Sequence, residues 1–235
     1  MNWIEHIVEP TKLFLTWQSP DVNNRLRRVV AHLLKDGENN ASLVYLTDTE
    51  DFKKAKEAGF TGFPAFGLER NKHDNALDIF LKRLPPKSRG DYDKYLEAIR
   101  IKPKTTISDF TLLGYSGVKL PDDDFVLLHP FDNAKGEFEL LVEVCGFRHI
   151  DNVSDIRALL KEGQVVSLQK DTKNPVDSTA IKIIFNGIKL GYINRALLPV
   201  FNKWFDNNSI KKTVIERING TATTPKLYLF VRMKV

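Results

Sequence analysis

The stretch that most restricts the fold is residues 174–181, with the sequence Asn-Pro-Val-Asp-Ser-Thr-Ala-Ile. It lies between two apolar, β-prone runs at residues 164–169 and 181–185. Proline fixes φ, and asparagine and aspartate side chains fold back onto the local backbone, so the stretch predicts a turn between two strands. The turn is longer and more polar than a two-residue hairpin needs. Extra polar residues at a strand junction indicate a candidate binding site.

Further motifs surround this turn in a fixed order. Residues 146–149 (Gly-Phe-Arg-His) precede it, Asn186 and Gly187 follow it, and residues 190–193 (Leu-Gly-Tyr-Ile) end the series. In this order and spacing, residues 143–235 resemble a HIRAN domain, a small module found beside helicases and nucleases and also alone in bacterial proteins. The resemblance implies a small β-barrel of the SH3 or OB type with one or two helices.

The resemblance also implies nucleic-acid binding, because a DNA-bound member of this family holds single-stranded DNA at its free 3′ end. In that member the arginine matching Arg148 contacts the DNA end. The aspartate matching Asp177 accepts a hydrogen bond from the terminal 3′-hydroxyl. The candidate nucleic-acid-binding residues are Arg148, His149, Lys170, Asn174, Asp177, Tyr192, Asn194 and Arg195.

Local structural roles compete with binding at several positions. Asp177 is also suited to cap the turn through nearby amides, Asn194 to cap a helix, and Tyr192 to pack in the core. Two positions depart from the DNA-binding relative, because His149 stands where an aromatic neighbour is usual and Val176 replaces a stacking tyrosine. A stacked base contributes about 1–3 kcal/mol, so the valine predicts weaker binding.

Positive charge is concentrated in the HIRAN-like part. The whole chain carries a formal net charge of +5. Residues 143–235 contain 15 Lys and Arg against 8 Asp and Glu, whereas the preceding residues contain 20 against 22. This distribution favours a phosphate-binding surface, and a solvated basic surface without a ligand is the alternative.

The N-terminal half predicts a mixed α+β domain. The apolar runs at residues 12–17, 28–34 and 42–46 predict strands. Residues 47–51 (Thr-Asp-Thr-Glu-Asp) predict a capped helix start, and Gly59 is suited to end that helix.

Two more helices are expected, over residues 91–101 and from residue 108 to the turn at residues 114–117, followed by a strand at residues 125–128. The basic residues between 82 and 89 are compatible with phosphate binding or with a solvated turn. The Gly/Pro/aromatic loop at residues 60–67 is either a binding loop or, more commonly, a tight turn around buried aromatics.

Residues 77–128 resemble the N-terminal subdomain of HipA-type toxins. The motifs are Phe-Leu-x-x-Leu-Pro-x-x-x-Arg at residues 80–89 and Asp-Phe-x-Leu-Leu-x-x-x-Gly at residues 109–117. The resemblance implies protein contacts and regulation. It does not imply kinase activity, because no kinase catalytic loop follows.

In the C-terminal half, a helix is expected after Asn194 and a final strand at residues 227–235. Residues 217–225 read as a polar loop. Cys145 is expected to be a buried, inert thiol. Helical spacing predicts that one set of side chains faces the core: Leu197, Phe201, Trp204 and Phe205.

Together these patterns predict an α+β protein with two domains. The polar turn at residues 130–136 separates two apolar runs and divides residues 1–133 from residues 134–235. A single cysteine excludes an internal disulfide, and neither a secretory signal nor a membrane-length apolar run is present. A cytoplasmic protein is therefore expected.

Catalytic motifs are missing from the sequence. The five histidines lack metal-ligand spacing, and no Walker motif or nucleophile elbow occurs. We expect no enzyme activity, no metal and no cofactor. The acidic run at residues 122–124 predicts a solvated turn more than a cation site.

The leading hypothesis is a module that binds single-stranded DNA or DNA ends, with a protein partner at the N-terminal domain and no membrane contact. The alternative is a protein-interaction or regulatory subunit of the toxin–antitoxin or phage-defence type. A metal-dependent nuclease is a third, remote hypothesis.

Overall fold

The structure, a computed structural model, describes residues 1–21, 24–120 and 123–235. The chain divides into two compact units: an N-terminal unit of residues 8–99 and 103–133, and a C-terminal unit of residues 1–7, 100–102 and 134–235. The boundary predicted between residues 133 and 134 is where the chain enters the C-terminal unit for the last time. Two short segments from earlier in the chain also belong to that unit.

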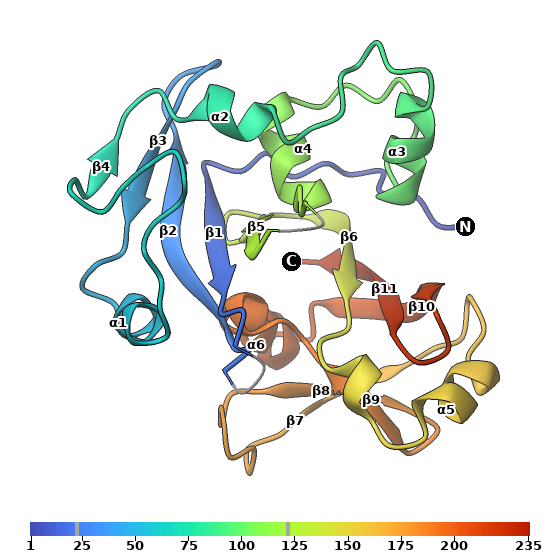
Figure 1. The fold of residues 1–235 in the computed structure, drawn as a ribbon. Coiled ribbons are helices and arrows are strands. Elements are labelled where there is room, and N and C mark those ends of the chain that lie inside the picture. The colour runs from blue at the N-terminus through green and yellow to red at the C-terminus, as the bar shows by residue number, and fades with distance from the viewer. Residues whose placement is uncertain (22–23, 121–122) are drawn as a thin grey trace. The chain divides into compact units, whose positions relative to one another are not determined.

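The N-terminal unit is built on a five-stranded antiparallel sheet with the strand order β4-β3-β2-β1-β5 (Figure 1). This confirms the predicted mixed α+β character and its four predicted strands. Its elements are β1 (Lys12–Gln18), β2 (Arg27–Lys35), β3 (Ala41–Tyr45), α1 (Glu50–Glu57), β4 (Lys72–His73), α2 (Leu77–Leu81), α3 (Tyr92–Ala98), α4 (Asp109–Ser116) and β5 (Phe125–Leu128).

The helix boundaries of this unit follow local chemistry. The Thr49 side chain accepts a hydrogen bond from the Phe52 amide and so caps α1, and Gly59 follows the helix with φ of +96°. Ser108 caps α4 in the same way, and Gly117 ends it in the left-handed conformation. The predicted caps and stops are confirmed.

Aromatic side chains fill the core of this unit. Phe60 and Phe63 in the Gly/Pro/aromatic loop are buried and pack against Phe125. The buried Tyr45 hydroxyl accepts a hydrogen bond from the Phe63 amide at 2.9 Å and donates one to the Phe66 carbonyl. The loop is therefore part of the core, as its commoner interpretation predicted.

Three of the basic residues between 82 and 89 are engaged in ion pairs. These pairs are Arg83–Asp123 at 2.5 Å, Lys87–Asp109 at 2.7 Å and Arg89–Asp91 at 2.5 Å. Asp123, from the predicted acidic turn, is thus paired with a largely buried arginine, while Asp122 lies outside the described residues. A phosphate would have to displace these carboxylates.

The C-terminal unit contains two three-stranded antiparallel sheets, with strand orders β10-β11-β6 and β7-β8-β9 (Figure 1). Its elements are β6 (Glu137–Glu143), η1 (Phe147–His149), α5 (Val153–Leu159), β7 (Ser167–Lys170), β8 (Ile181–Phe185), β9 (Ile188–Tyr192), η2 (Arg195–Leu197), α6 (Leu198–Asp206), β10 (Ile210–Gly220) and β11 (Pro225–Lys234).

The described strands do not close into the predicted barrel. The two sheets remain open and are connected by isolated bridges, between Cys145 and Tyr192 and between Val165 and Val214. Each bridge joins one residue pair, which is too little pairing to form a continuous cylinder of strands. The mixed α+β class of the C-terminal unit is confirmed, and the barrel is not.

Two local predictions in this unit are wrong. Residues 217–220 are strand rather than loop, because β10 continues to Gly220 and leaves only residues 221–224 as the turn before β11. Cys145 is exposed, since strand alternation buries its neighbour Val144 instead.

The helix after Asn194 is confirmed as η2 and α6, and its predicted core residues Leu197, Phe201 and Trp204 are buried. Phe205, the fourth predicted core residue, is only partly buried. None of the helices in the described residues has the length and apolarity to cross a membrane.

Candidate nucleic-acid interface

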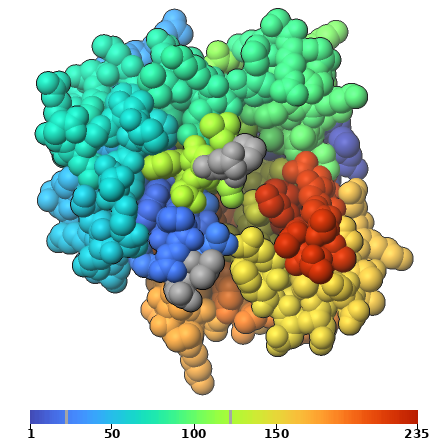
Figure 2. Space-filling view, in the orientation of Figure 1, coloured from blue at the N-terminus to red at the C-terminus, as the bar shows by residue number. Residues whose placement is uncertain are grey.

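The loop between β7 and β8 holds its shape through its own polar side chains. The Asn174 side-chain oxygen accepts hydrogen bonds from the amides of Val176 at 2.9 Å and Asp177 at 3.1 Å. This arrangement is the side-chain turn expected of an Asn-Pro sequence. The loop, coloured orange, protrudes from the surface in Figure 2. It is thus an exposed element whose backbone is fixed from within.

Asp177 connects this loop to the helical segment that follows β9. Its Oδ1 accepts hydrogen bonds from the Thr179 amide at 2.9 Å and the Thr179 hydroxyl at 2.6 Å. Its Oδ2 lies 3.4 Å from Nε of Arg195. Partial burial raises the pKa of Asp177, but the hydrogen bonds from Thr179 and the charge of Arg195 outweigh it and lower the pKa. The predicted capping role of Asp177 is confirmed at Thr179.

Asp171 is a member of this site that the sequence interpretation missed. Its Oδ2 accepts hydrogen bonds from the Tyr192 hydroxyl at 3.0 Å and from the Asn174 side chain at 3.3 Å. These two bonds lower the pKa of Asp171. Desolvation raises the pKa, but the charges of Lys182 and Lys189 lower it further. Asp171 therefore holds Tyr192 beside the loop.

The register of the sheet separates the candidate residues into two faces. Gln169 lies opposite Lys182, and Lys182 lies opposite Tyr192, so these three side chains share one face. Lys170 lies opposite the buried Ile181 on the other face. There its ammonium pairs with Asp206 of α6 at 2.5 Å and lies over the Phe205 ring. Lys170 is therefore not part of the group around Tyr192.

A glycine brings η1 to the end of β9. Gly191 has φ of +143°, and a Cβ there would lie 2.3 Å from the Cys145 carbonyl oxygen. Only a residue without a side chain allows the Cys145–Tyr192 bridge at this distance. Because η1 begins two residues after Cys145, the bridge brings η1 to β9, and the two elements are in contact. Within η1, the exposed Arg148 donates a hydrogen bond from Nε to Nε2 of His149 at 2.9 Å.

The remaining candidate residues have mainly local roles. The Asn194 side chain accepts a hydrogen bond from the Ala196 amide and caps η2, which confirms its alternative interpretation. Tyr192 is partly exposed, and the Lys189 ammonium lies 5.2 Å from the centre of its ring. Val176 is 70% exposed at the tip of the loop.

The structure thus gathers residues from several segments of the chain at one end of the β7-β8-β9 sheet. Direct contacts join Asp171, Asn174, Asp177, Tyr192 and Arg195. The segment η1, which carries Arg148 and His149, follows the Cys145–Tyr192 bridge and contacts β9. Among the described residues, no group of three or more His, Cys, Asp or Glu side chains is arranged to hold a metal ion.

Comparison with known proteins gives the class of the C-terminal unit. Residues 137–232 match the family model of the HIRAN domain, which supports a HIRAN domain in this part of the chain. The resemblance of residues 77–128 to the HipA subdomain gains no such support and stays a prediction. No curated protein matches the chain.

Two solved structures are similar to the chain. One is a protein from Lactobacillus plantarum, with 24% identity, a TM-score of 0.34, and coverage of 42% of this chain and 99% of that chain. The other is the HIRAN domain of human HLTF, with 24% identity, a TM-score of 0.32, and coverage of 42% of this chain and 81% of that chain.

Proposed function

We propose that the HIRAN domain binds single-stranded DNA at a free 3′ end, through the face that carries Asp177, Arg195 and Tyr192. The observation that supports this most is the Asp177–Arg195 pair, which joins the exposed β7–β8 loop to η2 at 3.4 Å. A lone carboxylate repels nucleic acid, because phosphates carry the same charge. A carboxylate beside an arginine suits the 3′ end of a DNA strand. There the terminal hydroxyl can donate a hydrogen bond to the carboxylate, and the last phosphate can pair with the arginine.

The carboxylate of Asp177 can accept a further hydrogen bond, which favours a hydroxyl donor as its ligand. Oδ1 already accepts two hydrogen bonds from Thr179, whereas Oδ2, which lies 3.4 Å from Nε of Arg195, can accept a further one. Because the pKa of Asp177 is lowered, the group stays ionised at neutral pH and acts as an acceptor only. A 3′-hydroxyl can donate to it, whereas a 3′-phosphate brings negative charge against negative charge.

Cations around the site supply the affinity for the preceding phosphates. Lys182 and Lys189 lie on or beside the face of Tyr192, and Arg148 is exposed on η1. Binding should therefore weaken steeply as salt rises, because each neutralised phosphate releases counterions.

The decisive experiment is fluorescence anisotropy with oligonucleotides that differ only at the 3′ end. We expect the chain to bind the 3′-hydroxyl form about ten-fold more tightly than the 3′-phosphate form, in line with a hydrogen bond to a charged group. The Asp177→Asn variant keeps an acceptor for Thr179 and removes the charge, so it should bind both forms alike. Equal binding of the two oligonucleotides by the wild-type chain would contradict end recognition.

A second experiment supplies the stacking platform that Val176 lacks. Because Val176 is 70% exposed, Val176→Tyr should fold normally and strengthen binding by about 1–3 kcal/mol. Val165 is 67% exposed outside the loop, so Val165→Tyr is a matched control that should leave DNA binding unchanged. Equal gains in the two variants would indicate nonspecific stacking.

The alternative function is protein interaction or regulation, of the toxin–antitoxin or phage-defence type. It is favoured by the exposed valine at residue 176 and by His149, whose ring is engaged by Arg148. If Arg148→Ala leaves DNA binding unchanged, this alternative gains over the leading proposal. In both cases the proposed activity is binding without catalysis, and a metal-dependent cleavage assay with the same oligonucleotides tests that part.

A further inference from the structure

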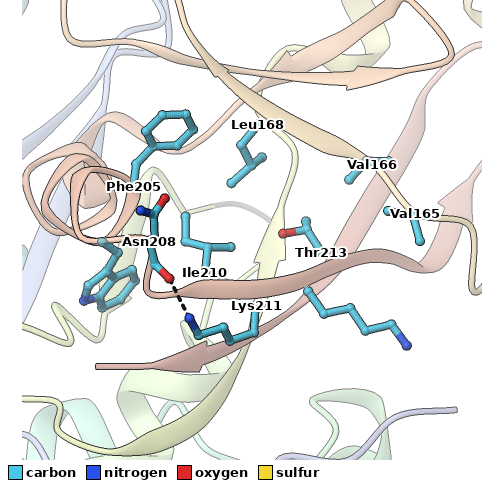
Figure 3. A pocket seen from close by; sticks show the side chains of 10 residues that line it. Val165, Val166, Leu168, Phe205, Asn208, Ile210, Lys211 and Thr213 are labelled. Atoms are coloured by element: carbon cyan, nitrogen blue, oxygen red, sulfur yellow. Dashed lines mark hydrogen bonds between the residues drawn. The ribbon is translucent and has the colours of Figure 1, made fainter.

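The face of β7 opposite to Tyr192 borders a hollow in the surface. The hollow is a cavity of about 440 Å³ between the segment that leads into β7, the end of α6 and the start of β10. Figure 3 shows Leu168 and Val166 on one side, Phe205 and Asn208 on another, and Ile210 and Thr213 opposite. We call this hollow the β7/β10 groove.

The groove exists because two strands separate after a short paired stretch. The Val166 amide donates to the Thr213 carbonyl at 3.1 Å, and the Ile215 amide donates to the Gln164 carbonyl at 2.9 Å. Beyond Val166 the chain leaves β10 and pairs with β8 instead. The residues of β10 before Thr213 then line the opposite side of the groove.

Backbone groups of β7 point into this gap. The Asp171 amide donates to the Ala180 carbonyl, and in an antiparallel pair every second residue bonds to the same neighbour. Gln169 therefore faces β8, while the amides and carbonyls of Leu168 and Lys170 face away from it. β7 and β10 are each the outermost strand of their sheets among the described residues. An outer strand with both donors and acceptors is a template for another strand.

The lining adds apolar surface and positive charge. Leu168, Phe205 and Ile210 contribute apolar side chains, and Lys211 and Lys212 lie at the β10 side. Among the described residues, none of the side chains that line the groove is acidic. An extended segment with apolar side chains on one face and acidic side chains along it would complement this surface.

We propose that the β7/β10 groove binds an extended peptide segment of a protein partner, which adds as a strand to β7 and places acidic side chains against Lys211 and Lys212. A peptide supplies both amide donors and carbonyl acceptors for a strand edge. A nucleic-acid backbone presents phosphate acceptors but no matching row of donors. The site is separate from the proposed DNA face, because Leu168 lies opposite the buried Ile183, away from Tyr192.

The probe for this proposal is a phage-displayed library of random 12-residue peptides, panned on the full chain. Enriched peptides should alternate apolar and other side chains and carry acidic residues. After synthesis with a fluorescent label, they should bind Lys211→Glu/Lys212→Glu at least ten-fold more weakly than wild type. The matched control is Lys53→Glu/Lys56→Glu, which makes the same charge change at exposed positions of α1.

Hydrogen exchange on the wild-type chain tests the geometry without any variant. Peptide binding should slow exchange at the outward amides of Leu168 and Lys170. Arg195→Ala should bind the peptide as wild type does, even if it binds no DNA, so the two proposals can fail separately.

Several results would overturn the proposal. They are a library that yields no binding peptide, peptides that ignore the lysine reversals, and protection of the same amides by an oligonucleotide. If the Leu168 and Lys170 amides become more protected as the protein concentration rises without peptide, the groove binds a second copy of the chain instead.

Discussion

The two units bury different kinds of polar group. The aromatic core of the N-terminal unit buries neutral ones, such as the Tyr45 hydroxyl and the His129 ring. Among its described residues, the charged side chains that this unit largely buries are arginines, Arg28 and Arg83, and Arg83 pairs with Asp123. The C-terminal unit buries ionic ones: Glu216 on β10 pairs with Arg100 at 2.6 Å, and both side chains are largely inaccessible. Glu139 on β6 is likewise buried. The two units therefore differ in their buried acids, because the C-terminal unit encloses the carboxylates of Glu139 and Glu216.

Several partners of these buried acids come from the two short segments outside the matched HIRAN range, while Arg232, inside that range, lies 3.7 Å from Glu139. Asn2 and Arg100 bind Glu216, and the amides of Glu5 and His6 donate to Glu139 at 3.0 and 3.2 Å. The range 137–232 contains both acids but lacks these partners. We therefore expect residues 1–7 and 100–102 to stabilise the C-terminal unit.

The largest expected effect comes from removing the buried cation. Arg100→Met keeps much of the side-chain volume and leaves Glu216 buried without its charge partner, which should cost about 3–5 kcal/mol. Hydrogen exchange at the β10 and β11 amides measures the loss in the full chain. The β1 and β2 amides should keep their protection.

The exposed pair Lys102–Glu5, at 2.8 Å, is the matched control from the same segments. Lys102→Ala should cost less than about 1 kcal/mol, because water screens this pair. The double variant Arg100→Met/Glu216→Gln should lose less than Arg100→Met alone, since no unpaired charge is left. Equal losses for Arg100→Met and Lys102→Ala would show that burial of charge does not distinguish the units.

The N-terminal unit should be sensitive to acid through His129. Burial lowers the pKa of His129 to about 4, while its ring nitrogens bond to the Val8 carbonyl and the Phe131 amide. Below its ordinary pKa of 6.5, the unfolded state takes up a proton that the folded state refuses until about pH 4. Stability should therefore fall across this window, by about 3 kcal/mol at its lower end.

The acid effect of His129 can be separated from that of other groups. His129→Gln removes the titration, so the loss between pH 6.5 and 4 at the β1 and β2 amides should shrink by about the same 3 kcal/mol. Hydrogen exchange corrected for its intrinsic pH dependence gives this difference. An unchanged pH profile in the variant would contradict the assignment to His129.

A smaller loss is expected from the Tyr45 hydroxyl. Tyr45→Phe keeps the ring in the core and leaves the Phe63 amide and the Phe66 carbonyl without this partner. Leaving buried groups unpaired should cost about 1–3 kcal/mol, less than the buried charge of Glu216. Urea unfolding measures the loss, and a cost as large as that of Arg100→Met would remove the contrast between neutral and ionic burial.

Local chemistry explains why much of the fold was predictable from the sequence. The caps at Thr49 and Ser108 and the turn at Asn174 each depend on residues within a few positions. The same holds for Asp177, whose bonds to Thr179 are local. The HIRAN match then agrees with the motif order read from the sequence.

Long-range contacts explain the failures. Asp171 is joined to β9 because Tyr192, 21 positions later, donates to it. Lys170, a predicted site residue, is not part of the site, because its side chain pairs with Asp206, 36 positions away. The roles of Arg100 and Asn2 depend on Glu216, 116 and 214 positions away, which no local pattern encodes.

The contrast between the units should vanish at the surface, where the expected effects are smallest. Lys54–Glu50 on α1 at 3.1 Å and Lys234–Glu137 between β11 and β6 at 2.9 Å are ion pairs with exposed side chains, one in each unit. Lys54→Ala and Lys234→Ala should each cost less than about 1 kcal/mol, because exposed pairs gain little over hydration. Hydrogen exchange at α1 and at β11 measures both. A loss at Lys234 well above that at Lys54 would mean that the C-terminal unit depends on charge generally, and not on the buried pair in particular.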